Sequence, residues 1–186
     1  RDALRERIAA LAQHGGDLVT GITRRPGGRL FYLKRAAGES QFKLVLRQGL
    51  RGAERVLVDP QALARASGVP HAVNYFRPSW DGRTLAYGIS AGGSEQASLH
   101  VVDVASGKPL RAPVPRVVQR GIHWSPDDRW LSFNQLRDLP ADAPETEYYL
   151  DSAVLLFDRL HPQRKPRPLF GPLLRPDLQL DRLDVG

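Results

Sequence analysis

The sequence predicts an all-β fold: antiparallel β-propeller blades in a partial, open arc, preceded by a short N-terminal amphipathic helix. Three observations support this prediction. Short apolar runs rich in β-branched and aromatic residues recur along the chain, Gly, Pro and Asp turns separate them, and one turn-and-strand motif repeats. The repeat spans roughly fifty residues and holds several strands, which is typical of propeller blades.

The helix is expected at the start of the chain, over residues 2–14. Leu4, Ile8 and Leu11 have the spacing of one helix face, and Gly15-Gly16 would end the helix. We therefore expect residues 1–16 to form a helical segment leading into the propeller. Residues 17–186 would form the partial propeller, with roughly two to three blades.

Four strands are expected next, because the apolar pattern changes to that of a sheet. They are 18–22, 30–33, 42–46 and 56–58. A brief helix over 61–66 should follow Asp59-Pro60 and end before Gly68.

The repeat lies in the middle of the chain. Residues 79–87 (SWDGRTLAY) return as 125–133 (SPDDRWLSF), and more faintly as 27–32 (GGRLFY). In each copy Asp or Gly supplies a tight turn, Arg follows, and an alternating strand leaves the turn. A strand precedes each of the two stronger turns and a further strand follows each copy; these strands are 73–76, 121–124, 99–104 and 153–158. A generic β-sandwich would also show frequent turns, but the repeat favours the propeller.

Composition narrows the possible partners. The net charge is +7, yet the arginines are scattered through every segment, so we expect no nucleic-acid partner. No apolar run approaches the roughly 18 residues of a membrane span, and we expect no membrane partner. The chain has no Cys, which leaves cytoplasm and periplasm equally open. It also has no Met, which suggests a piece cut from a longer polypeptide.

One catalytic motif has to be weighed. Residues 88–92 (GISAG) match the G-x-S-x-G nucleophile elbow, which places its serine between a strand and a helix. Here a strand is expected soon afterwards, near Ser98, so a hairpin loop is the better interpretation of Ser90. We expect no catalytic residue, no metal site and no cofactor, because the histidines have no ligand spacing and the acids Asp81, Asp103 and Asp127-Asp128 fit turn positions. Trp80, Trp124 and Trp130 are expected to pack between blades.

The residues resemble a known family. The run 76–95 (FRPSWDGRTLAYGISAGGSE), followed by 101–108 (VVDVASGK), is similar to the early propeller blades of prolyl oligopeptidases. The preceding 55–60 (RVLVDP) and the following 121–127 (GIHWSPD) extend the resemblance. It covers nearly the whole chain, in order.

The resemblance implies a function for a longer parent protein. In this family a propeller caps an α/β-hydrolase domain that cleaves peptides after proline, and it limits substrates to short peptides. This chain would then be a noncatalytic, inactive fragment of a serine endopeptidase, with its own catalytic domain and a short peptide as partners. The alternative is a stand-alone propeller or sandwich module that binds a protein partner.

The family pattern also suggests where substrate would lie. Many members carry a substrate-lining aromatic residue shortly before the Trp-containing strand, and the corresponding place here is Gln119 or Arg120. These two are the candidate substrate-lining residues. A His common in the family is replaced around Phe157-Asp158.

Overall fold

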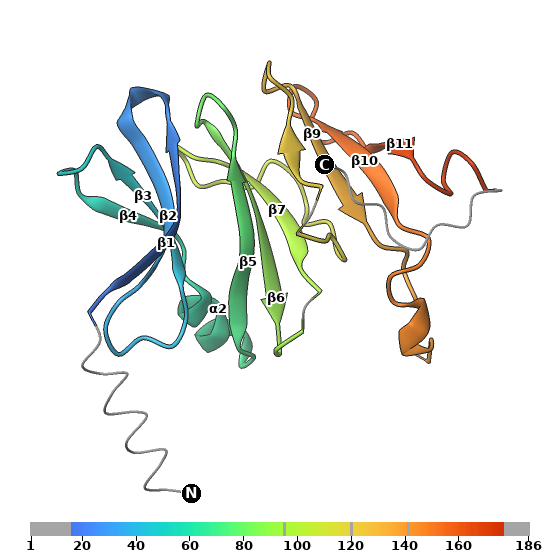
Figure 1. Ribbon diagram of the computed structural model, residues 1–186, viewed down its shortest axis with the longest axis horizontal. Helices are drawn as coiled ribbons and strands as arrows, with labels where there is room; N and C mark the ends of the chain where they lie inside the picture. The colour runs from blue at the N-terminus through green and yellow to red at the C-terminus, as the bar shows by residue number, and fades with distance from the viewer. Residues whose placement is uncertain (1–15, 95, 120, 141, 177–186) are drawn as a thin grey trace, which may run out of the picture. The chain divides into compact units, whose positions relative to one another are not determined.

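Antiparallel sheets make up most of the fold, which confirms the predicted all-β class with open sheets. The computed structural model describes residues 16–94, 96–119, 121–140 and 142–176 (Figure 1). The helix expected over 2–14 lies outside these ranges. The chain divides into two compact units between Val73 and Asn74. No helix in the described part of the chain is long and apolar enough to cross a membrane.

The first unit contains one four-stranded sheet in which each strand pairs with the next along the chain. All four strands predicted for this region are present, and a one-turn 3-10 helix η1 (Pro26–Gly28) connects the first two. The strands are β1 (Leu18–Arg25), β2 (Arg29–Arg35), β3 (Lys43–Gln48) and β4 (Glu54–Val58).

The helix expected over 61–66 is also present, as α2 (Pro60–Ser67). Its ends follow from local chemistry. The Asp59 carboxylate accepts the backbone N–H groups of Gln61 and Ala62 at 2.9 and 3.2 Å, which caps the first turn. Gly68 ends the helix in the left-handed region, with φ 75°.

The second unit contains two sheets, and β5 begins just before the boundary between the units. One sheet has the order β5-β6-β7, and the other has the order β11-β10-β9-β8. The segment 109–114 adds isolated bridges to the free edge of β7. The strands are β5 (His71–Pro78), β6 (Thr84–Ala91), β7 (Ser98–Asp103), β8 (His123–Trp124), β9 (Trp130–Gln135), β10 (Ala153–Asp158) and β11 (Arg167–Phe170).

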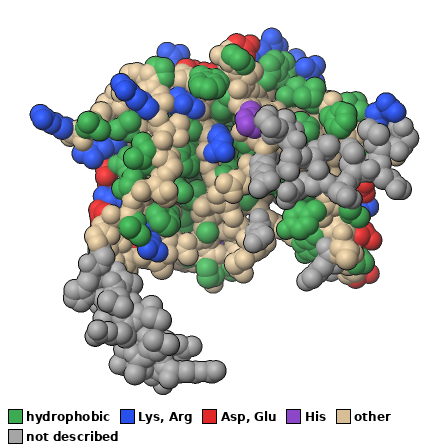
Figure 2. Space-filling view, in the orientation of Figure 1, with side chains coloured by type: hydrophobic (Ala, Val, Ile, Leu, Met, Phe, Trp, Pro, Cys, Tyr) green, Lys and Arg blue, Asp and Glu red, His purple; other side chains and the backbone are tan. Residues whose placement is uncertain are grey.

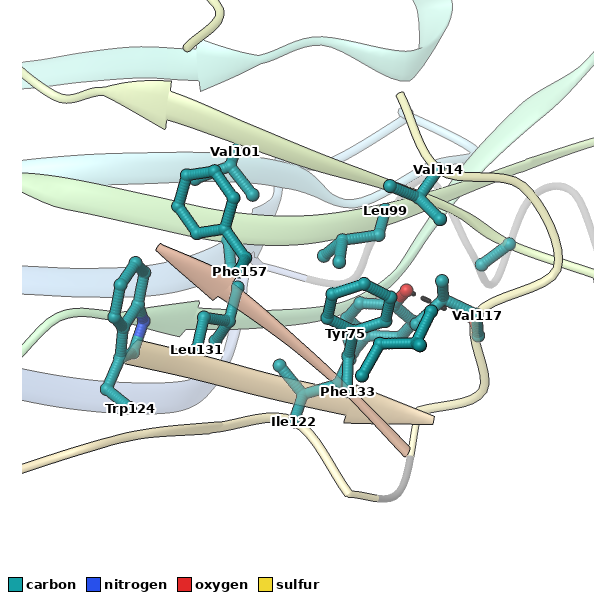
Figure 3. Close-up of a cluster of buried hydrophobic side chains, with 13 residues drawn as sticks. Tyr75, Leu99, Val101, Val114, Val117, Ile122, Trp124, Leu131, Phe133 and Phe157 are labelled. Atoms are coloured by element: carbon teal, nitrogen blue, oxygen red, sulfur yellow. Dashed lines mark hydrogen bonds between the residues drawn. The ribbon is translucent and has the colours of Figure 1, made fainter. Parts of the chain in front are cut away.

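A hydrophobic core joins these two sheets (Figure 3). Alternate residues of β9 and β10 point into it, which is the period-2 pattern read from the sequence. The larger members are Tyr75, Leu99, Val101, Ile122, Trp124, Leu131, Phe133, Leu155 and Phe157. The Tyr75 hydroxyl donates a hydrogen bond to the Val117 carbonyl over 3.2 Å, so the buried phenol is satisfied.

The close packing of Tyr75 explains one glycine. A Cβ atom added to Gly88 would lie 2.2 Å from the Tyr75 ring carbon Cζ. No real Cβ atom tolerates that distance, so the Tyr75 ring occupies the space that a side chain at position 88 would need.

The repeated turns have the same hydrogen bonds. Ser79 and Ser125 each donate a backbone N–H to the carbonyl five residues ahead, at 2.9 and 2.8 Å. Their hydroxyls donate to Asp81 and Asp127 at 2.6 and 2.5 Å. The predicted turn repeat is therefore also a repeat in three dimensions.

Strand β11 was not expected from the sequence. Pro166 and Pro168 interrupt the apolar pattern and remove backbone donors, which argues against a central strand. The sheet accommodates Pro168 because β11 is the edge strand next to β10.

Candidate functional site

The two repeated turns of the second unit are tied together by one buried carboxylate. Asp128 accepts the backbone N–H groups of Trp80 and Asp81 at 2.5 and 2.7 Å. Its own backbone has φ 58°, at the position where the preceding copy of the turn has Gly82. Asp tolerates this left-handed conformation better than most residues. The carboxylate therefore links the β5–β6 hairpin to the β8–β9 hairpin.

Arg159, which follows β10, adds charge to this link. Its Nη2 donates to Asp81 at 2.8 Å, and its Nη1 lies 3.9 Å from an Asp128 carboxylate oxygen. Burial alone would raise the pKa of Asp81. Hydrogen bonds from Ser79, from the Arg83 N–H and from Arg159 outweigh burial and lower that pKa to about 2. Asp81 is therefore ionised at neutral pH.

A second polar cluster lies at the other end of the same strands. The Arg116 guanidinium donates to the Arg137 carbonyl, the Gln96 side-chain oxygen and the Tyr148 carbonyl at 2.9, 2.8 and 2.9 Å. It also lies over the Tyr148 ring, 5.2 Å from the centroid. Three loops thus meet at one side chain: the β6–β7 hairpin, the segment leading into β8, and the β9–β10 connection.

The substrate-lining candidates follow directly after this cluster. Gln119 is exposed, in a bend, and Arg120 lies outside the described residues. The backbone just before Gln119 is fixed, because Val117 donates to the Ala97 carbonyl at 3.0 Å and Val118 to the Asn134 carbonyl at 3.1 Å. The Gln119 side chain is therefore presented at the surface next to an anchored segment.

A cleft of about 540 Å³ opens beside the β9–β10 connection. Leu136, Ala153 and Leu155 contribute apolar walls, and Arg137 and Asp151 contribute charge. Those two side chains form an ion pair at 3.4 Å. Such a mixed lining is common in ligand sites.

Ser90 lies within β6 and is buried, with 5% of its surface exposed. A hairpin follows it, with the Ser94 N–H donating to the Ala91 carbonyl at 3.1 Å. The strand–turn–helix geometry that a nucleophile elbow requires is not formed at Ser90. A hairpin does follow, but Ser90 itself lies in strand β6 and not in the expected hairpin loop.

Two of the described histidines contact neighbouring side chains. His100 stacks on Tyr87 with centroids 5.0 Å apart, and burial lowers the pKa of His100. His161 contacts Asp158 at 3.0 Å. Among residues 16–94, 96–119, 121–140 and 142–176, no group of three or more His, Cys, Asp or Glu side chains is arranged to hold a metal ion.

The three tryptophans differ in their environments. Trp124 belongs to the core between the sheets and donates through Nε1 to the Arg77 carbonyl at 3.0 Å, as expected for packing between blades. Trp80 is 53% exposed. Trp130 is half-buried, with the Arg129 and Arg167 guanidiniums 4.8 and 4.6 Å from its ring centroid.

Lys and Arg side chains are spread over the face shown in Figure 2. Several Lys and Arg side chains of the described residues form local ion pairs. Arg137 pairs with Glu147 at 2.7 Å, and Lys34 pairs with Asp17 and Glu54 at 2.8 and 2.9 Å. This distribution fits the scattered arginines of the sequence.

The repeated turns, and the two sheets of the second unit that pack against each other through one hydrophobic core, are typical of a segment of a β-propeller. The family model described as "Prolyl oligopeptidase, N-terminal beta-propeller domain" matches residues 1–154. This chain belongs to the family of prolyl oligopeptidase N-terminal β-propeller domains.

Solved structures agree with this assignment. One similar structure comes from a study of two prolyl endopeptidases and the role of inter-domain dynamics in their catalysis and specificity. It is 26% identical to this chain, with a TM-score of 0.71, and the match covers 90% of this chain and 24% of the other protein. Prolyl oligopeptidase B from Galerina marginata shares the fold. Its complex with a 35mer substrate is 14% identical, with a TM-score of 0.71 over 91% of this chain and 26% of its own. Its apo form is 17% identical, with a TM-score of 0.64 and the same coverages. The chain thus spans about a quarter of the length of these proteins.

Proposed function

We propose that this chain is the noncatalytic front part of a propeller that restricts the access of short proline-containing peptides to a serine-peptidase active site. That site would lie in an α/β-hydrolase domain of the same polypeptide. The observation that carries the proposal is the family match over residues 1–154, within a family named for prolyl oligopeptidases. In this proposal residues 1–16 lead into the propeller, residues 17–186 form its first blades, and the chain itself hydrolyses nothing.

Gln119 is the substrate-facing residue in this proposal, with Arg120 beside it. Support comes from the exposure of Gln119 and from its anchored neighbours Val117 and Val118. An amide at this position offers hydrogen bonds to a peptide backbone, whereas an aromatic residue would offer a stacking surface. The side chain at position 119 would therefore tune affinity for the peptide without taking part in bond cleavage.

The test uses the full-length polypeptide that contains this chain. Cleavage of a short proline-containing chromogenic peptide is compared with cleavage of the same site placed within a long unstructured chain. We expect kcat/KM to fall by on the order of a hundredfold for the long chain, because access through a propeller excludes it. Equal values for both substrates would overturn restricted access.

Position 119 has its own test. Gln119→Trp in the full-length protein should change KM for the short peptide by roughly three- to tenfold with little change in kcat. A native gene product with the mass of this chain alone, and no hydrolase domain, would instead favour a stand-alone module that binds a protein partner.

A further inference from the structure

Arg116 has a backbone conformation that only a strong local constraint maintains. Its φ is 57°, in the left-handed region, where residues other than glycine are uncommon. This strained residue lies directly before the segment 117–119. Two backbone hydrogen bonds hold the chain at this point. The Arg116 carbonyl accepts the Leu136 N–H at 2.9 Å, and the Val117 N–H donates to the Ala97 carbonyl at 3.0 Å.

The conformation aims the guanidinium at three separate loops. Nε donates to the Arg137 carbonyl, Nη1 to the Gln96 side chain and Nη2 to the Tyr148 carbonyl, all within 2.8–2.9 Å. Only arginine has a rigid fork with donors that diverge in this way. A lysine at the same position would keep the charge but reach fewer of these acceptors.

The β9–β10 connection depends on these contacts. It is long for a loop between neighbouring strands, and its described part is 136–140 and 142–152. Its regular structure is a single turn of 3-10 helix, η2 (Glu145–Glu147). Arg137 closes the loop on itself through ion pairs with Glu147 at 2.7 Å and Asp151 at 3.4 Å. Such exposed pairs contribute little on their own.

We propose that Arg116 is a positioning residue that holds the β9–β10 connection against the segment carrying Gln119. The two then present one surface at this end of the strands. This inference rests on the proposed function where it concerns substrate. It predicts that Arg116 sets the discrimination between short and long peptides by fixing that surface.

The first test measures backbone protection in the full-length protein by amide hydrogen exchange. Arg116→Gly removes the guanidinium while its backbone still adopts φ 57° without strain, and Arg116→Lys, which keeps a side chain, controls for the added backbone freedom of glycine. We expect exchange in 142–152 to rise on the order of tenfold or more, with β10 unchanged. Arg116→Lys should give a similar rise. Arg164→Gly, which removes an exposed arginine elsewhere in the second unit, is the matched control and should leave 142–152 unchanged.

The second test measures kcat/KM for the short peptide and for the long chain with the same three variants. We expect the kcat/KM for the short peptide divided by the kcat/KM for the long chain to fall about tenfold in Arg116→Gly and Arg116→Lys. The same ratio should stay constant in Arg164→Gly. A general loss of folded protein would lower both values and leave the ratio unchanged.

The outcomes separate the two ideas. Unchanged exchange in 142–152 overturns the positioning role, whatever the peptidase assays show. Raised exchange with an unchanged ratio overturns the link to substrate discrimination. If the wild-type protein cleaves no proline-containing peptide, the proposed function fails, while the exchange data still decide whether Arg116 positions the loop.

Discussion

The Asp128 carboxylate accepts the backbone N–H of Asp81 over 2.7 Å and so joins two turns that are copies of one another. Each copy satisfies its own backbone with a Ser hydroxyl and an Asp carboxylate, so Asp128 is available for the neighbouring copy. A hydrogen bond to a buried charged group is stronger than one between neutral groups. The link is therefore a local determinant of how the two sheets of the second unit pack.

The first prediction concerns this link. Asp128→Asn keeps a residue that tolerates φ 58° but removes the charge and one acceptor oxygen. We expect the free energy of unfolding to fall by about 1.5–3 kcal/mol. Urea unfolding monitored by tryptophan fluorescence measures it. Asp127→Asn is the matched control, because Asp127 is exposed and accepts hydrogen bonds from Ser125 and Arg129 of its own turn. A loss as large in the control would contradict a special role for Asp128.

The second prediction is a pH dependence. The pKa of Asp81 is lowered to about 2 in the folded state, from the usual 3.8 of an aspartate side chain. A depressed carboxyl pKa stabilises the folded state above the unfolded pKa, and this stabilisation is lost as the pH falls through the folded pKa. We therefore expect a loss on the order of 1–2 kcal/mol between about pH 4 and pH 2, after allowance for the partial exposure of Asp81.

Comparison with Asp81→Asn isolates this contribution. The variant has no titrating group at position 81, so its free energy of unfolding should depend less on pH in the same window. Chemical denaturation at about pH 5 and about pH 2.5 measures the difference for both proteins. Identical pH dependences would show that Asp81 is not the group responsible.

Several elements were predictable from local sequence. The bounds of β10 match the expected strand 153–158, and α2 was signalled by Asp59, Pro60 and Gly68. These features depend on alternation and capping, which are properties of neighbouring residues. The all-β class followed from the same signals.

The links between loops were not predictable in this way. Gln96, Arg116, Arg137 and Tyr148 share no spacing or motif, and they meet only because the sheets bring three loops together. The tie from Asp128 to Trp80 is likewise a tertiary contact. A positive φ at a residue other than glycine cannot in general be recognised from the sequence. At Asp128 the repeat offered a signal, because the equivalent position in the preceding copy is Gly82.

A third prediction concerns reactivity. Ser90 is buried in strand β6, and a hairpin rather than the helix of a nucleophile elbow follows it, so we expect its hydroxyl not to be activated. We expect no adduct on the peptide containing Ser90 after treatment with a serine-reactive fluorophosphonate. Peptide mapping by mass spectrometry checks this, and detection of labelled Ser90 would revive an esterase role. Labelling elsewhere in a longer parent protein is compatible with the proposal.

The last prediction addresses the packing of Gly88 against Tyr75. Gly88→Ala would place a Cβ atom 2.2 Å from the Tyr75 ring, in a core where both neighbours are held by strand pairing. The ring cannot move without losing its hydrogen bond to Val117 and its contacts with the facing sheet. Overpacking of this kind costs about 1–3 kcal/mol, and more when backbone must shift. Gly16→Ala is the matched control, since a Cβ atom there meets nothing within 4 Å and should change stability by less than about 0.5 kcal/mol. Thermal unfolding of both variants measures the difference, and equal melting temperatures would mean that the Tyr75 ring has room to move.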